Sequence, residues 1–116
     1  MLNRAALILR YKKPAVTWIN EADPYRNDPA STLSSVNEEC TVYLLSDRDA
    51  ETPATLAKWV KRNFQNVFES ELEGWYVDES LWPSGRDFKM FNEWFTVECH
   101  TVIVDTVGGE ICDDEV

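Results

Sequence analysis

The sequence predicts a single α+β domain over residues 1–116, a two-layer sandwich in which two to three helices pack on a small mixed sheet of three to four strands. Three observations predict this fold. The length suits one hydrophobic core. A content of 44% hydrophobic and 28% charged residues is typical of a globular protein. Short strand-like runs alternate with segments whose apolar residues recur every three or four positions.

The first part of the chain predicts a strand followed by a helix. Residues 5–11 (AALILRY) are mostly apolar, and Pro14 is typical of the first position of a helix. The apolar residues after it fall at i, i+3, i+4 and i+7, on one helical face: Ala15, Trp18, Ile19 and Ala22. Two Asp-Pro steps and a Ser/Thr cluster predict a long surface loop over residues 23–35.

A second strand and the longest helix are expected in the middle of the chain. Residues 40–46 (CTVYLLS) have the β-branched and aromatic content of a strand covered on both faces. Thr52 and Pro53 suit the N-cap and the first helical position. Apolar residues then recur about every four positions, and Gly74 is a typical C-terminal stop.

A short third helix is expected after an irregular segment over residues 75–85. That segment combines aromatic, acidic and turn residues. Ser84, with Asp87 three residues later, matches a capping box, and aromatic residues at helical spacing follow it up to Phe95.

The chain is expected to close the sheet with a final strand over residues 97–107. Gly108 and Gly109 supply the backbone freedom that a tight hairpin requires. Residues 110–116 would then return as an edge strand or remain a solvated acidic tail.

The formal charge of -10 lies almost entirely in the second half of the chain. Residues 1–68 carry nine Lys/Arg and eight Asp/Glu, whereas residues 69–116 carry two and thirteen. Such a field repels phosphate backbones and anionic lipid and favours a protein partner with a basic surface. We therefore expect neither a nucleic-acid nor a membrane partner. The alternative is that the charge serves only to keep the protein soluble.

A cytoplasmic location and no cofactor are expected from what the sequence lacks. The apolar run AALIL is too short for a signal-peptide core or a membrane span. Cys40, Cys99 and Cys112 are odd in number and form no C-x-x-C pair, which argues against a disulfide framework or a thiolate zinc site. Common nucleotide-binding and hydrolase motifs are missing.

No catalytic set is assigned, although His100 and Asp105 are candidates. His100 is the single histidine and suits general-base chemistry. Neighbouring side chains of a strand point to opposite faces of the sheet. Cys99 and His100 therefore cannot form a thiol–imidazole pair within the strand that they share. Asp47 and Asp49, just beyond the second strand, are candidate ligands for a divalent cation. Arg48 between them supplies a neutralising charge, and no metal site is predicted.

The candidate binding residues lie in the segment GWYVDESLWP, where aromatic and acidic side chains alternate loosely: Trp75, Tyr76, Asp78, Glu79 and Trp82. Aromatic rings with acidic neighbours are typical of a surface that recognises a basic partner. The alternative is that these rings cap the core where the long helix ends.

The sequence therefore favours a non-enzymatic interaction or regulatory module that contacts a basic protein. One version is an inhibitor or immunity-type protein, whose charge would speed association. A second hypothesis is a small metal-assisted hydrolase using His100, Asp47, Asp49 and Asp105 at the edge of the sheet. A third is a homodimer formed through a strand edge or an aromatic patch.

Overall fold

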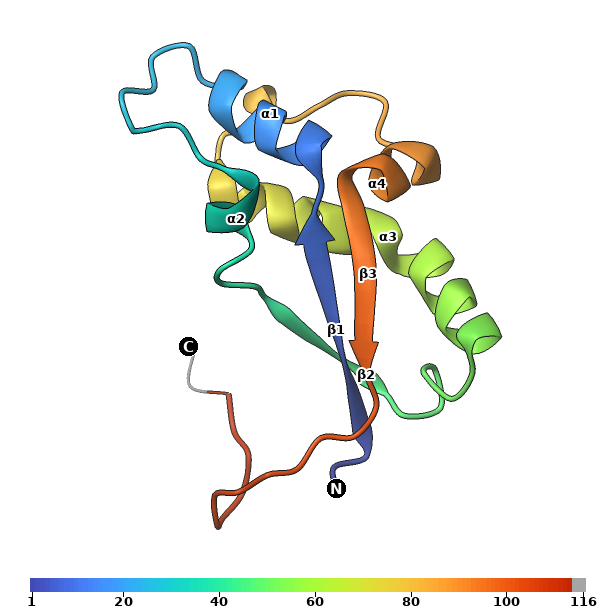
Figure 1. Ribbon diagram of the computed structural model, residues 1–116. Helices are drawn as coiled ribbons and strands as arrows, with labels where there is room; N and C mark the ends of the chain where they lie inside the picture. Colours follow the sequence, from blue (N-terminus) through green and yellow to red (C-terminus); the bar gives the residue numbers. More distant parts are fainter. Residues whose placement is uncertain (114–116) are drawn as a thin grey trace.

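The computed structural model describes residues 1–113 and confirms the α+β class (Figure 1). Its elements in chain order are β1 (Arg4–Tyr11), α1 (Lys13–Glu21), α2 (Leu33–Val36), β2 (Val42–Ser46), α3 (Pro53–Trp75), the 3-10 turn η1 (Glu79–Leu81), α4 (Phe88–Trp94) and β3 (Phe95–His100). The single turn α2 lies inside the segment expected to be a loop. Thr32 caps it by accepting a hydrogen bond from the Ser35 amide.

The sheet has the strand order β2-β1-β3, and both outer strands are antiparallel to β1. It is therefore antiparallel throughout the described residues instead of mixed. α1 and α2 return the chain to the end of the sheet where β1 stops, so β2 runs back alongside β1. α3 and α4 then bring the chain to that same end, from which β3 starts (Figure 1). β2 and β3 are thus parallel to each other but separated by β1.

The helices cover one face of the sheet and form the core with it (Figure 1). β1 directs alternate side chains toward the helices, and these are buried: Ala5, Leu7, Leu9 and Tyr11. α3 contributes a stripe at three- and four-residue spacing, in which Phe64 is partly buried and the other members are buried: Val60, Phe64, Val67, Phe68 and Leu72. Full burial of a Leu or Phe side chain contributes about 1.5–3 kcal/mol. The two stripes therefore fix how α3 lies on the sheet.

The ends of the two later helices follow from local hydrogen bonds. Thr52 caps α3 in a capping box with Thr55, as its sequence predicts, and the helix ends one residue beyond Gly74. α4 is capped by Asp87, whose carboxylate accepts from the Met90 amide at 2.8 Å, and not by Ser84. None of the helices in residues 1–113 combines the length and apolar character needed to cross a lipid bilayer.

β2 is an exposed edge strand, contrary to the expectation that both its faces are covered. Leu45 is its one buried residue, whereas Val42 is 51% and Leu44 56% exposed. The pattern of a doubly covered strand is misleading here because the helices form a layer on one face of the sheet only. The other face, which we call the outer face, carries the alternate side chains.

The final strand is shorter than its sequence predicts. β3 ends at His100, which pairs with Ala6, and β1 itself begins only two residues before that position. Beyond His100 the Leu2 amide donates to the Ile103 carbonyl, but no strand forms over residues 101–113. Gly109 adopts a φ of 106° in a bend that leads to no returning strand in residues 110–113. Residues 114–116 of the expected edge strand lie outside the described residues.

Candidate binding site at Glu71

Glu71 of α3 is the one buried charged residue among residues 1–113, with 9% of its surface exposed. It lies three positions after Phe68 and four after Val67, both of which are buried. Helical periodicity therefore places its carboxylate on the core face of α3. A carboxylate in such a position is costly unless donors satisfy it.

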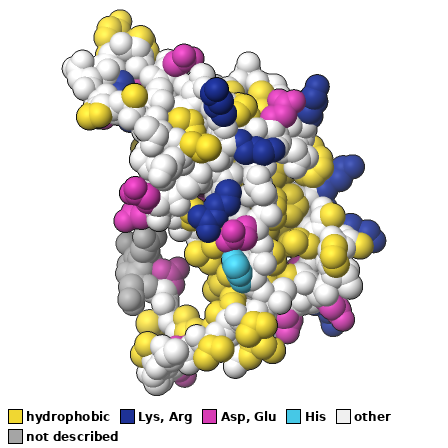
Figure 2. All heavy atoms as spheres, in the orientation of Figure 1, with side chains coloured by type: hydrophobic (Ala, Val, Ile, Leu, Met, Phe, Trp, Pro, Cys, Tyr) yellow, Lys and Arg dark blue, Asp and Glu magenta, His cyan; other side chains and the backbone are white. Residues whose placement is uncertain are grey.

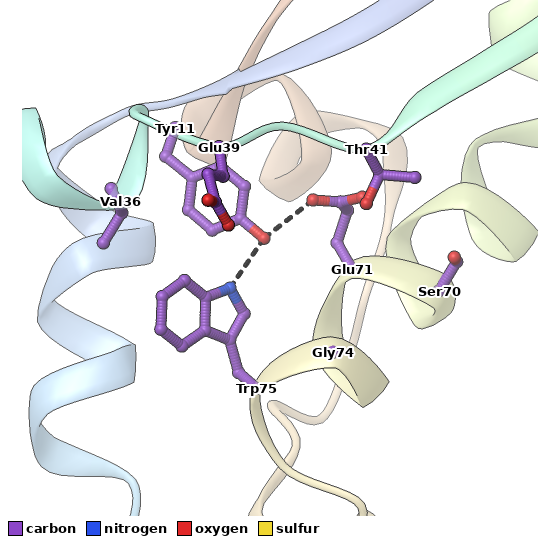
Figure 3. Close-up of a pocket in the computed structure, with 8 residues that line it drawn as sticks. All are labelled: Tyr11, Val36, Glu39, Thr41, Ser70, Glu71, Gly74 and Trp75. Carbon is purple, nitrogen blue, oxygen red and sulfur yellow. Dashed lines mark hydrogen bonds between the residues drawn. The ribbon is translucent and has the colours of Figure 1, made fainter.

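Two tyrosines of the sheet supply those donors. The Tyr11 hydroxyl, at the end of β1, donates to Glu71 Oε1 at 2.8 Å. The Tyr43 hydroxyl of β2 donates to Glu71 Oε2 in a short hydrogen bond, and Ser70 Oγ lies 3.0 Å from the same hydroxyl. The Trp75 indole N–H in turn donates to the Tyr11 oxygen at 2.8 Å (Figure 3). A continuous chain of hydrogen bonds thus joins β1, β2 and the last turns of α3.

Both tyrosines are held in their protonated, donating form. Burial raises the pKa of Tyr11, and the negative charge of Glu71 raises it further. Burial also raises the pKa of Tyr43, and its hydrogen bond to Glu71 adds to the shift. Each phenol therefore remains a donor to the carboxylate throughout the neutral pH range.

The carboxylate borders a hollow in the surface, which we call the acidic hollow (Figure 3). It has a volume of about 170 Å³ and is bounded by Tyr11, Val36, Glu39, Thr41, Ser70, Glu71, Gly74 and Trp75. A hollow of this size is large enough for the end group of one side chain. Its polar wall combines two carboxylates with two hydroxyls, and its aromatic wall combines a phenol with an indole.

The acidic hollow contains acceptors but no cation. No Lys or Arg is among its described lining residues, and no ion pair involving Glu71 or Glu39 occurs within residues 1–113. Charge-assisted hydrogen bonds contribute about 1.5–3 kcal/mol each, so the two tyrosines offset much of the cost of burying Glu71. The negative charge itself remains unpaired by any positive group.

His100 lies on the outer face of the sheet, remote from that hollow. His100 Nε2 is 2.8 Å from Glu98 Oε2, and Glu98 also forms an ion pair with Arg10 at 3.2 Å. Figure 2 shows the histidine (cyan) at the surface beside an acidic side chain. The hydrogen bond from His100 and then that from Arg10 lower the pKa of Glu98. Cys99 pairs with Leu7, on the opposite face of β3, so it does not meet His100.

The candidate aspartates are dispersed. Asp49 Oδ1 is 3.7 Å from Arg62, and its other oxygen accepts from Ser46 Oγ. Asp105 accepts from the Val107 amide beyond the end of β3. Asp47 lies in the turn that follows β2. No group of three His, Cys, Asp or Glu side chains that could hold a metal ion occurs within residues 1–113, so the structure does not bring His100 and the three aspartates together as one metal site.

The predicted aromatic and acidic segment is divided among several environments. Trp75 borders the acidic hollow and is 37% exposed. The Tyr76 hydroxyl donates to the Ile19 carbonyl, and the Trp82 indole donates to the Tyr76 carbonyl at 2.8 Å. Asp78 caps η1, and Glu79 is exposed within it. Their role in binding stays a prediction, but only Trp75 belongs to the acidic hollow.

Sequence reasoning missed Glu71, although the sequence contains a signal for it. A glutamate interrupts the apolar stripe of a long amphipathic helix at a position that periodicity assigns to the core. A charged residue there needs buried partners or a ligand. Tyr11 and Tyr43 gave no such signal, because their meeting at Glu71 depends on how three elements pack.

Comparisons with protein-family models, with curated protein sequences and with solved structures found no match.

Proposed function

We propose that this protein is a non-enzymatic binding module for a basic protein partner, and that a lysine or arginine side chain of the partner enters the acidic hollow. The observation that carries the proposal is Glu71, a buried carboxylate that two tyrosines hold in place and that forms no ion pair with any Lys, Arg or His of residues 1–113. Glu39, Thr41 and Ser70 supply further acceptors for an ammonium or guanidinium group. Trp75 and Tyr11 supply ring surfaces for the stem of the side chain.

The charge of the whole chain supports this assignment. A cation about 4 Å from a carboxylate gains on the order of 4 kcal/mol at an effective dielectric constant of 20. The net charge of -10 would also attract a basic partner from a distance and accelerate association at low salt. Local chemistry and the long-range field therefore favour the same kind of ligand.

A titration with acetyl-lysine-amide and acetyl-arginine-amide peptides tests the proposal. We expect calorimetry to detect binding that weakens as salt increases, and Glu71→Gln to weaken it by about tenfold or more, because the substitution removes the charge but keeps the size of the side chain. Glu73→Gln is the matched control. It makes the same charge change on the exposed side of the same helix, so affinity should change by less than about twofold.

The proposal fails if both variants bind as the unaltered protein does, or if uncharged acetyl-norleucine-amide binds equally well. Circular dichroism of Glu71→Gln at the titration temperature separates a loss of binding from a loss of folding.

A further inference from the structure

The free edge of β2 is open to a further strand. Within the described residues β2 pairs only with β1, so alternate N–H and C=O groups on its other side have no strand partner. Edge strands are commonly protected by Lys, Pro or a bulge. The sequence of β2, VYLLS, contains no Lys or Pro, and its five residues pair with β1 in unbroken register.

A second hollow lies along this edge, between β2 and α3. We call it the edge groove; it is bounded by residues 42–44 of β2 and by Trp59, Asn63, Asn66 and Val67 of α3. Its lining mixes apolar surface with side-chain amides. Such a mixture suits a peptide whose backbone is hydrogen-bonded while a side chain is buried.

The edge groove and the acidic hollow follow the same seam. The acidic hollow is bounded by Glu39 and Thr41, just before β2, and by residues 70–75 of α3. The edge groove is bounded by the next residues of β2 and by residues 59–67 of α3. Tyr43 connects the two, because it borders the edge groove while its hydroxyl donates to Glu71. An extended segment placed along β2 would therefore pass both hollows.

We propose that the partner binds by adding an extended segment to the free edge of β2 as a fourth strand, with an apolar side chain in the edge groove and a lysine or arginine in the acidic hollow. This inference rests on the proposed function and specifies the form of the partner. The negative charge at one end of the seam selects a basic peptide over a second copy of this acidic chain.

The geometry sets the order and spacing of the two side chains. Successive residues of a strand advance about 3.3 Å, and alternate residues share a face. Tyr43 of the edge groove lies two residues after Thr41 and four after Glu39 of the acidic hollow, so the two side chains of the partner belong at positions i and i+2 or i and i+4. β2 runs from the acidic hollow toward the edge groove. An antiparallel partner, the more stable pairing, therefore presents its apolar residue before its basic residue.

Synthetic peptides test this arrangement on the intact protein. The probe is acetyl-Thr-Val-Thr-Lys-Thr-amide, and its matched control, acetyl-Thr-Lys-Thr-Val-Thr-amide, reverses the two key residues. We expect the probe to bind at least about fivefold more tightly in calorimetry. Alternate backbone amides of the bound probe face β2, and the others face away from it. N-methylation of the amides that face β2 should weaken binding about tenfold, whereas N-methylation of the others should leave the affinity unchanged.

The outcomes separate this inference from the proposed function. Equal binding of all N-methylated probes, with Glu71→Gln still weakening them, would overturn strand addition and leave the basic-partner proposal standing. Binding that is indifferent to Glu71→Gln as well would remove both. A dimer in light scattering that the probe does not dissociate would show that a second copy occupies the edge, and would also overturn the inference.

Discussion

Tyr11 links the sheet to the acidic hollow through both its side chain and its backbone. Its hydroxyl donates to Glu71 and accepts from Trp75. Its amide donates to the Asn37 side-chain oxygen at 2.8 Å, which holds the end of β1 against the segment after α2. Removal of the hydroxyl should therefore disturb both stability and the site.

Tyr11→Phe is expected to lower the free energy of unfolding by about 1–3 kcal/mol at pH 7, because a buried carboxylate oxygen and an indole N–H both lose their partner. Urea denaturation followed by circular dichroism measures the change. Tyr25→Phe is the control, since Tyr25 is 88% exposed and its substitution should leave the free energy unchanged. Equal midpoints for the two variants would contradict the role assigned to the hydroxyl.

The same variant should alter the response to alkaline pH. The pKa of Tyr11 and that of Tyr43 are raised above the ordinary value of 10.0, so the folded state keeps these protons when the unfolded state releases them. Stability is then fully present below about pH 10 and falls as the pH rises further. Tyr11→Phe removes one of the two groups, so the same urea denaturation repeated at alkaline pH should show a shallower fall.

Among the elements, the start of α3 was the most predictable part of the fold, whereas the start of α4 was predicted at the wrong cap, Ser84 instead of Asp87. Thr52 and Pro53 define the start of α3 by a side-chain cap and a fixed φ, both of which are local effects. The strands were less predictable, because the cover over β2 and the length of β3 depend on neighbours remote in sequence. The acidic hollow likewise could not be foreseen beyond Glu71, since its walls come from separate elements.

The cap of α3 gives a prediction at this scale. Thr52→Ala should lower the free energy of unfolding by about 1 kcal/mol, because the Thr55 amide loses its acceptor. The measurement is thermal unfolding of the Thr52→Ala variant, with the Thr55→Ala variant measured alongside as the control. Thr55→Ala leaves that amide capped and removes only the reciprocal half of the capping box, so it should cost less. An equal or larger loss for Thr55→Ala would contradict this account of the cap.

In the whole molecule, one helical layer covers one face of a three-stranded sheet, and residues 101–113 add no helix or strand to either layer. Its apolar side chains Val104, Val107 and Ile111 are each at least 64% exposed. The sequence predicted a strand up to residue 107, closed by Gly108 and Gly109, but the pairing of β3 with β1 ends at His100, opposite Ala6, close to the start of β1. Pairing partners, not strand propensity, therefore set where the sheet ends.

A chain that ends at Ile103 should consequently keep the stability of the full chain to within about 0.5 kcal/mol, because the apolar side chains of residues 104–113 are largely exposed. Urea denaturation of the two chains side by side is the measurement. The hydrogen bond from the Leu2 amide to Ile103 is retained in the shorter chain. A loss above about 1 kcal/mol would mean that the removed segment packs on the sheet.

Two tryptophans lie along the seam between β2 and α3, so ligand binding there can be followed by tryptophan fluorescence. Trp75 borders the acidic hollow, and Trp59 borders the edge groove. Indole fluorescence responds to the polarity and charge around the ring, so each indole reports on one end of the seam. The chain has five tryptophans, so the signal of each ring is obtained by difference: a ligand-induced change in emission that is lost in Trp59→Phe but kept in Trp75→Phe would place the ligand at the edge groove, and the reverse would place it at the acidic hollow.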